Sequence, residues 1–191
     1  MAGKPKKGRS EINNVIPKKS EVSRKVGVYW GRFNPPHSGH MSVIKSFNEN
    51  YQLIVAIGSS EHKNELTNPF SGTERKEMME AYLRELNIHG VRVVTLNDGD
   101  SFSRAVDRMM KKCHPDVLFL SDEKNELAEV ARKRVEVVFF PRTGKISSSL
   151  IRDYIAAGDG RWKRLTGDSV ARLIMQFDGL RRIRKAHGIS L

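Results

Sequence analysis

Residues 26–40, VGVYWGRFNPPHSGH, decide the fold of this chain. The first five residues form an apolar, β-rich segment that breaks at Gly31, and the two prolines that follow keep the loop out of a helix. Apolar residues then recur at helical spacing after Gly39, at Met41, Ile44 and Phe47. The pattern predicts a strand, a tight loop and a helix in succession.

The loop in this unit has the chemistry of an anion site. It carries His37 and His40, and the glycine between them lets a ligand approach the backbone closely. The start of the predicted helix adds free backbone N–H groups and the positive end of the helix dipole. Two histidines at this spacing could instead cap the helix or bind zinc. Zinc is disfavoured because the chain offers a single cysteine and no obvious third ligand.

Strand and helix patterns alternate beyond this unit. Short apolar strands are predicted at residues 51–57, 91–96, 117–120 and 135–140. Thr73 is a candidate cap for the first of three helices predicted between them, at residues 73–86, 101–112 and 122–133. Two C-terminal helices follow, at residues 147–156 and 169–186. This order predicts an α/β fold with a doubly wound, Rossmann-like parallel sheet.

Ligands in such a sheet collect beyond the carboxyl ends of its strands. The loops after the first four strands and the stretch before residue 147 therefore face one crevice. Ser147, Ser148 and Ser149 open a helix there, and their hydroxyl and N–H groups can hold phosphates. We therefore expect the histidine loop and this helix start to share one ligand site.

Length and composition favour one domain. With 191 residues and 38% hydrophobic content, the chain can bury one good core, so we expect a single domain with tails. Residues 1–24 have few apolar residues and no period, and we expect a basic, disordered extension. Residues 25–160 form the predicted α/β domain, and residues 161–191 form a basic helical segment packed on it.

The net charge of +12 lies in the two termini. Residues 1–25 hold eight Lys and Arg against two Glu, residues 161–191 hold eight against two Asp, and the residues between are balanced. A basic tail can bind nucleic acid. A solvated surface is favoured here, because neither end interleaves its charges with base-stacking aromatic residues.

Composition also sets expectations about the compartment. One cysteine excludes a disulfide framework, which is typical of proteins in a reducing compartment. The sequence shows no signal peptide and no apolar run of roughly 18 residues, so we expect a cytoplasmic protein with no membrane partner. The sequence leaves a homo-oligomer open.

Four short blocks carry a resemblance to a known family. His37-Ser38-Gly39-His40 resembles the His-x-Gly-His signature of the nucleotidyltransferase superfamily. Residues 146–152, ISSSLIR, are similar to its second signature, Ile-Ser-Ser-Thr-x-Ile-Arg. The archaeal-type nicotinamide-nucleotide adenylyltransferases are most similar to the other two blocks, residues 31–35 (GRFNP) and 68–75 (NPFSGTER).

The resemblance implies a particular reaction. The 5'-phosphate of nicotinamide mononucleotide (NMN) attacks the α-phosphorus of ATP, with Mg²⁺ accompanying ATP, to give NAD and pyrophosphate. A phosphate monoester has a second pKa of about 6, so the nucleophile is an anion at neutral pH and needs no general base. The reaction instead needs alignment of two polyanions and donors for the charge that develops during transfer. Alternatives are another phosphate-ester acceptor, CTP as the donor, or a nucleotide- or nucleic-acid-binding protein that keeps the fold.

The resemblance also implies roles for the residues that match its motifs. Catalytic roles fall on His37, His40 and Arg152. Binding of ATP and its phosphates falls on Gly31, Arg32, Phe33, Gly39, Arg75, Ser147, Ser148 and Ser149. For the arginines, the planar guanidinium matches the oxygens of a phosphate.

Contacts with the acceptor fall on Asn34, Phe70 and Phe102. Asn34 stands where archaeal-type members usually have Gln. Residues 97–104 lack the tryptophan that those members place against the nicotinamide ring, and Phe102 is the nearest aromatic residue. Ser121 and Asn125 are further candidates, because the adenine-binding turn of the family lies in that region. No protein side chain is expected to ligate a metal.

Overall fold

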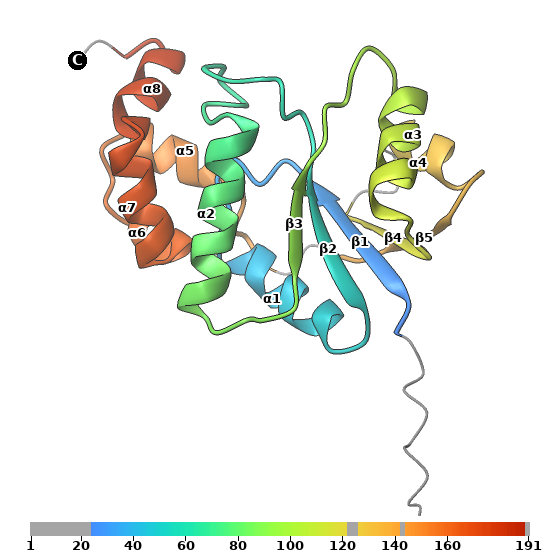
Figure 1. Cartoon of the computed structure of the whole chain (residues 1–191). Coiled ribbons are helices and arrows are strands. Elements are labelled where there is room, and N and C mark those ends of the chain that lie inside the picture. The colour runs from blue at the N-terminus through green and yellow to red at the C-terminus, as the bar shows by residue number, and fades with distance from the viewer. Residues whose placement is uncertain (1–23, 122–125, 142–143, 190–191) are drawn as a thin grey trace, which may run out of the picture.

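The computed structural model describes residues 24–121, 126–141 and 144–189, so the expectations for residues 1–23 lie outside it. Its centre is a five-stranded sheet in the order β3-β2-β1-β4-β5 (Figure 1). The strands are β1 (Val26–Gly31), β2 (Gln52–Ile57), β3 (Arg92–Thr95), β4 (Val117–Leu120) and β5 (Glu136–Phe139). All neighbours pair in parallel and the order turns back between β1 and β4, so the predicted doubly wound sheet is confirmed.

Helices cover both faces of this sheet (Figure 1). One face is covered by the C-terminal helices together with α1 (Ser38–Asn48) and α2 (Gly72–Glu85). The opposite face is covered by α3 (Phe102–Cys113) and α4 (Glu126–Ala131). The C-terminal helices are α5 (Ser148–Ala156), α6 (Trp162–Thr166), α7 (Asp168–Gln176) and α8 (Gly179–Ala186). None of these described helices has the length and apolar character that a membrane span requires.

The central strands are buried on both faces, as their near-continuous apolar runs predict. In β2, Leu53, Val55 and Ile57 belong to the core under α1 and α2, whereas Ile54 and Ala56 belong to the core under α3. Because the strands are parallel, their carboxyl ends lie at one edge of the sheet. The loops that leave this edge can therefore build a common site.

The C-terminal segment shares the core of the sheet. Val170 and Ile174 of α7 and Ile183 of α8 are wholly buried in the same cluster as side chains of α1 and α2. The backbone N–H groups of Asp168 and Ser169, at the start of α7, donate to the carboxylate of Glu85 in α2 over 3.1 and 2.7 Å. Both apolar packing and capping thus join α7 to the sheet domain.

One long predicted helix, residues 169–186, is two helices in the structure. The break lies at Asp178, which adopts a left-handed backbone conformation with φ of 57°. Gly179 then begins α8 against the ring of Phe70, where an added Cβ would lie 2.7 Å from ring atoms. Apolar spacing alone does not reveal such a break, because it continues across both helices.

The cap of α2 also differs from the prediction. Ser71, not Thr73, precedes the helix, and its hydroxyl accepts a hydrogen bond from the Glu74 N–H over 3.2 Å. The Glu74 carboxylate accepts the Ser71 N–H over 2.7 Å in return, which completes a capping box. In the helix predicted at residues 122–133, α4 is the described part, and residues 122–125 lie outside the described residues.

The shared core predicts a large effect of Ile174→Ala. Ile174 is wholly buried, so its truncation should lower the free energy of unfolding by about 2–5 kcal/mol. Met175→Ala is the matched control, because the neighbouring Met175 side chain is 47% exposed and should change stability by less than about 0.5 kcal/mol. Urea unfolding followed by circular dichroism measures both. Equal, small effects would show that α7 is not part of the core.

Candidate active site

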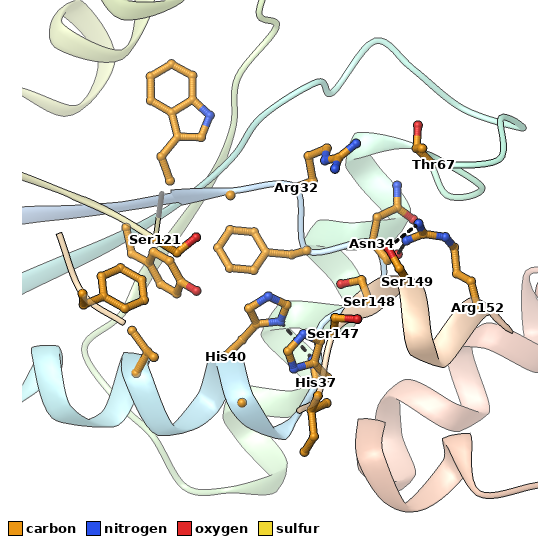
Figure 2. Close-up of a pocket in the computed structure, with 18 residues that line it drawn as sticks. Arg32, Asn34, His37, His40, Thr67, Ser121, Ser147, Ser148, Ser149 and Arg152 are labelled. Carbon is orange, nitrogen blue, oxygen red and sulfur yellow. Dashed lines mark hydrogen bonds between the residues drawn. The ribbon is translucent and has the colours of Figure 1, made fainter. Parts of the chain in front are cut away.

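A pocket opens at the carboxyl end of β1, between the first turns of α1 and α5 (Figure 2). Its lining combines the segment from Tyr29 to His40 with the start of α5 and single residues from three other loops. The two helices point their N-termini at the same space, and the first N–H groups of a helix lack intrahelical acceptors. The two motifs predicted to share a ligand site therefore do meet there.

The N-terminus of α1 fixes the ring of His40. The peptide N–H of His37, the N-cap residue, donates to Nδ1 of His40 over 3.2 Å. A neutral ring that accepts at Nδ1 carries its proton on Nε2, so His40 can donate from Nε2. The Phe33 ring packs edge-on against His40, with ring centroids 4.8 Å apart. The imidazole is thus held in one orientation before any ligand arrives.

His37 and His40 lie face to face in Figure 2. Their ring centroids are 3.6 Å apart and the ring planes differ by 29°. Two positive charges at this separation would repel each other strongly. A bound anion offsets that repulsion, and the pair can then supply donors to it.

The three serines at the N-terminus of α5 form different hydrogen bonds. The Ser147 hydroxyl accepts from the Leu150 N–H over 3.1 Å and caps the helix. The Ser148 hydroxyl donates to the carbonyl of Pro35 over 2.9 Å, so its proton is used within the protein. The hydroxyls of Ser147 and Ser149 act as acceptors and keep their own protons for a ligand. In this structure the Ser148 hydroxyl is bonded to the protein itself, and the phosphate contact predicted for Ser148 stays a prediction.

Arg152 supports the pocket and lines it. Its guanidinium donates to the carbonyl of Asn34 over 2.8 Å and to the hydroxyl of Ser149 over 3.1 Å. Burial lowers the pKa of Arg152, and the nearby positive charge of Arg32 lowers it further. Arg32 itself is exposed and also lines the pocket. Two arginines that repel each other leave a positive potential that an anion relieves.

The described lining of the pocket holds these cationic groups and hydroxyls and no carboxylate. Positive helix ends, arginines and N–H donors are the groups that bind phosphates. The chemistry of this lining is therefore suited to a polyanion. Gly31 and Gly39 belong to the same lining, and Gly31 is required because an added Cβ would lie 2.9 Å from the Phe33 ring.

The structure does not bring Arg75, for which the motif predicted phosphate binding, to the pocket. Arg75 is wholly buried in α2 and does not line the pocket. Its guanidinium donates to four backbone carbonyls, those of Arg32, Gly58, Ser59 and Ser71. The side chain therefore binds the protein itself. The motif placed it near the site but did not reveal its burial.

Of the three residues predicted to contact the acceptor, Asn34 lines the pocket, whereas Phe70 and Phe102 do not. The Asn34 amide is buried and forms paired hydrogen bonds with the backbone of Phe70, of 3.2 and 3.3 Å, so it joins two loops. Phe70 is wholly buried and cannot stack on a ligand. Phe102 is exposed at the start of α3 but does not line the pocket. The acceptor contacts of these three residues therefore stay predictions, with Asn34 the one that lies at the pocket.

Sequence reasoning missed some lining residues. Thr67, in the loop before α2, lines the pocket, and no sequence pattern distinguishes it from its neighbours. Ser121, which the sequence did offer as a candidate, follows β4 directly and also lines the pocket. The candidate Asn125 lies outside the described residues.

Comparison with known proteins identifies the family. The model of the cytidylyltransferase-like family matches residues 28–154. A nicotinamide-nucleotide adenylyltransferase of Thermococcus onnurineus is 30% identical over 168 residues, which are 84% of this chain and 87% of the relative. The chain therefore belongs to the cytidylyltransferase-like family of nucleotidyltransferases.

One further relative belongs to the same group of enzymes, and one solved structure shares the fold. A nicotinamide-nucleotide adenylyltransferase of Caldivirga maquilingensis is 31% identical over 164 residues, 83% of this chain and 92% of the relative. The fold is shared with the crystal structure of a bifunctional NMN adenylyltransferase/ADP ribose pyrophosphatase from Francisella tularensis, with a TM-score of 0.72 and 19% identity. That match covers 86% of this chain, which spans about half (54%) of the Francisella protein.

The pocket predicts that inorganic tripolyphosphate stabilises the protein. Arg32→Ala should weaken tripolyphosphate binding about 10- to 150-fold, as expected for one charge-assisted hydrogen bond of about 1.5–3 kcal/mol. The unliganded melting temperature should not fall, because Arg32 repels Arg152. Thermal shift against ligand concentration measures both effects.

Arg104→Ala is the control for this experiment. Arg104 is paired with Asp100 on the surface, and its loss should leave the tripolyphosphate shift unchanged. A wild-type protein that shows no shift with tripolyphosphate would contradict a polyanion site.

Proposed function

We propose that this protein is an adenylyltransferase that joins the AMP moiety of ATP to the 5'-phosphate of NMN, giving NAD and pyrophosphate. The observation that carries the proposal is the meeting of two helix N-termini with His40 and Arg152 in one pocket. The relatives from Thermococcus onnurineus and Caldivirga maquilingensis are nicotinamide-nucleotide adenylyltransferases, and they supply the choice of substrates.

The described lining of the pocket fits a reaction whose nucleophile is already ionised. The second pKa of a phosphate monoester is about 6, so the acceptor needs no carboxylate to remove a proton at neutral pH. The cationic lining instead reduces the repulsion between the acceptor phosphate and ATP. Catalysis then depends on alignment and on donors that meet the charge of the transition state.

In this proposal the donors divide between the two helices. His40 donates from Nε2 to an α-phosphate oxygen, and His37 holds the His40 ring through its peptide N–H. The N–H groups at the start of α5, with Ser149 and Arg152, bind the pyrophosphate that leaves. Arg32 faces the phosphates from the end of β1.

Mg²⁺ enters this proposal as part of the substrate, MgATP. The described residues contain no group of three His, Cys, Asp or Glu side chains suited to hold a metal ion. Phosphate oxygens of ATP, together with water, would therefore coordinate the Mg²⁺ ion. The ion would neutralise charge on the leaving pyrophosphate. We place the reaction in the cytoplasm, where the single cysteine, Cys113, stays reduced.

The reaction is tested by supplying ATP or CTP with NMN, nicotinate mononucleotide or phosphopantetheine in the presence of Mg²⁺. NAD and pyrophosphate should form together and in equal amounts from ATP and NMN. Efficient transfer from CTP, or to phosphopantetheine alone, would keep the reaction class and replace the substrates. Release of pyrophosphate with none of these acceptors would overturn the proposal.

His40→Ala should lower kcat and kcat/KM together, with little change in the KM for ATP. Loss of one donor that acts on the transition state costs about 2.7–4 kcal/mol, roughly 100- to 1000-fold in rate. His40→Asn keeps an N–H donor and should recover part of the rate. Steady-state kinetics measures these effects, and His89→Ala, at an exposed residue outside the pocket, is the control.

The proton on Nε2 also predicts how the wild-type rate depends on pH. If His40 donates from Nε2 as a neutral imidazole, as its Nδ1 acceptor contact allows, kcat should stay nearly constant from about pH 7 to about pH 9. A tenfold fall per pH unit over this range would show that the donor is a protonated imidazole.

A further inference from the structure

We infer that Arg75 is a positioning residue for this reaction: from inside the protein it fixes the ends of β1 and β2 from which the pocket is built. The inference rests on the proposed function, since the positioned groups are those that bind ATP. It replaces the phosphate contact that the sequence motif predicted for Arg75.

The contacts of Arg75 cover both strand ends. Nη1 donates to the carbonyls of Arg32 and Gly58 over 2.7 and 2.8 Å, and Nη2 donates to the carbonyl of Ser59 over 2.7 Å. Nε donates to Ser71 one turn earlier in α2 over 3.2 Å. One planar guanidinium thus holds the residue that follows β1 and the two that follow β2.

These carbonyls need a donor of this shape. The hydrogen-bond ladder between β1 and β2 ends with the bond from the Gly58 N–H to the Gly31 carbonyl, of 3.0 Å. The next carbonyls turn inward, and a buried carbonyl without a donor is costly. A guanidinium presents five N–H groups in a rigid plane, whereas an ammonium group is a compact point charge on a flexible stem. Lysine therefore cannot hold the same three carbonyls in the same geometry.

The buried charge remains an arginine cation. Burial lowers the pKa of Arg75 to about 10, and the negative charge of Asp98 acts in the opposite direction. Asp98 contacts the same strand end, because the Ser59 N–H and hydroxyl each donate to its carboxylate over 2.7 Å. In the peptide group between Gly58 and Ser59, Arg75 thus binds the carbonyl and Asp98 binds the N–H.

The link to the pocket runs through Arg32 and Phe33. Arg75 holds the carbonyl of Arg32, while the Arg32 side chain lines the pocket. The next residue, Phe33, is in a left-handed conformation with φ of 51°, and its ring supports His40. Rotation of the peptide group between Arg32 and Phe33 would displace a phosphate ligand and the support of the His40 ring together. Arg75 prevents that rotation.

The test compares Arg75→Lys and Arg75→Gln with the wild type in the full chain. Both variants should raise the KM for MgATP and weaken tripolyphosphate binding by about 10-fold or more, since an error of about 1 Å in position costs up to about 100-fold. Tripolyphosphate binding needs no turnover. A wild type that binds MgATP but makes no NAD would remove the proposed function and leave this test intact.

A double-mutant cycle with Arg32→Ala separates positioning from general damage. If Arg75 acts largely through Arg32, the KM of the double variant should be close to that of Arg32→Ala alone. Arg182→Lys is the control, because Arg182 donates to the carbonyl of Phe177 and the carboxylate of Glu74 but lines no part of the pocket. It should lower the melting temperature and leave the KM unchanged. Fully additive effects, or a loss of stability without a change in KM for Arg75→Lys, would overturn the inference.

A measurement on the wild type covers the case in which neither variant folds. In ¹⁵N NMR spectra, the guanidinium N–H signals of Arg75 should be slowly exchanging and should barely shift on addition of tripolyphosphate. The corresponding signals of Arg152 should shift strongly. A shift of the Arg75 signals as large as those of Arg152 would show direct contact with phosphate and would overturn the positioning role.

Discussion

The carbonyl groups of residues 32–35, between β1 and α1, are the constraint on which the pocket depends. This segment lies outside both helix and sheet, so its buried carbonyls must find donors elsewhere. They find them in side chains: Arg75 of α2 at residue 32, Arg152 of α5 at residue 34 and Ser148 of α5 at residue 35. The loop is therefore shaped by two helices that lie far from it in the sequence. The same loop then presents its histidines and arginine to the ligand.

Holding several cationic groups around one space is unfavourable without a ligand. The pKa of Arg152 is lowered by burial and by Arg32, and the stacked histidines add to the repulsion if both are charged. Among them, Arg152 is held by the Asn34 carbonyl and the Ser149 hydroxyl rather than by a carboxylate. Carbonyl dipoles stabilise a guanidinium without neutralising its charge. The charge thus stays available to phosphates, whose binding offsets a strain that was already present in the fold.

The sequence predicts the strand, loop and helix of the first unit, because composition and period are local properties, and the second motif predicts the start of α5. It does not distinguish the two motif arginines, Arg75 and Arg152, although one is enclosed by carbonyls and the other lines the pocket. That difference depends on where α2 and α5 pack, which is a property of the tertiary structure. The same holds for Phe70, an aromatic residue in a motif that packs against Gly179 of α8 instead of a ligand. Residues that bind the protein itself and residues that line the pocket thus both occur in the motifs, and the motifs alone do not separate them.

The bonds from α5 to the first loop also determine when the pocket can form during synthesis. The bond from Ser148 to Pro35 spans 113 residues, and that from Arg152 to Asn34 spans 118. At about 5–20 residues per second, a ribosome needs roughly 6–24 s to make the chain between these partners. Once β2 and α2 have been made, β1 can pair with β2 and α2 can supply Arg75, but the carbonyls at residues 34 and 35 still lack the donors from α5. The nucleotide site is consequently a late product of translation, completed only after residues 148–152 have left the ribosome.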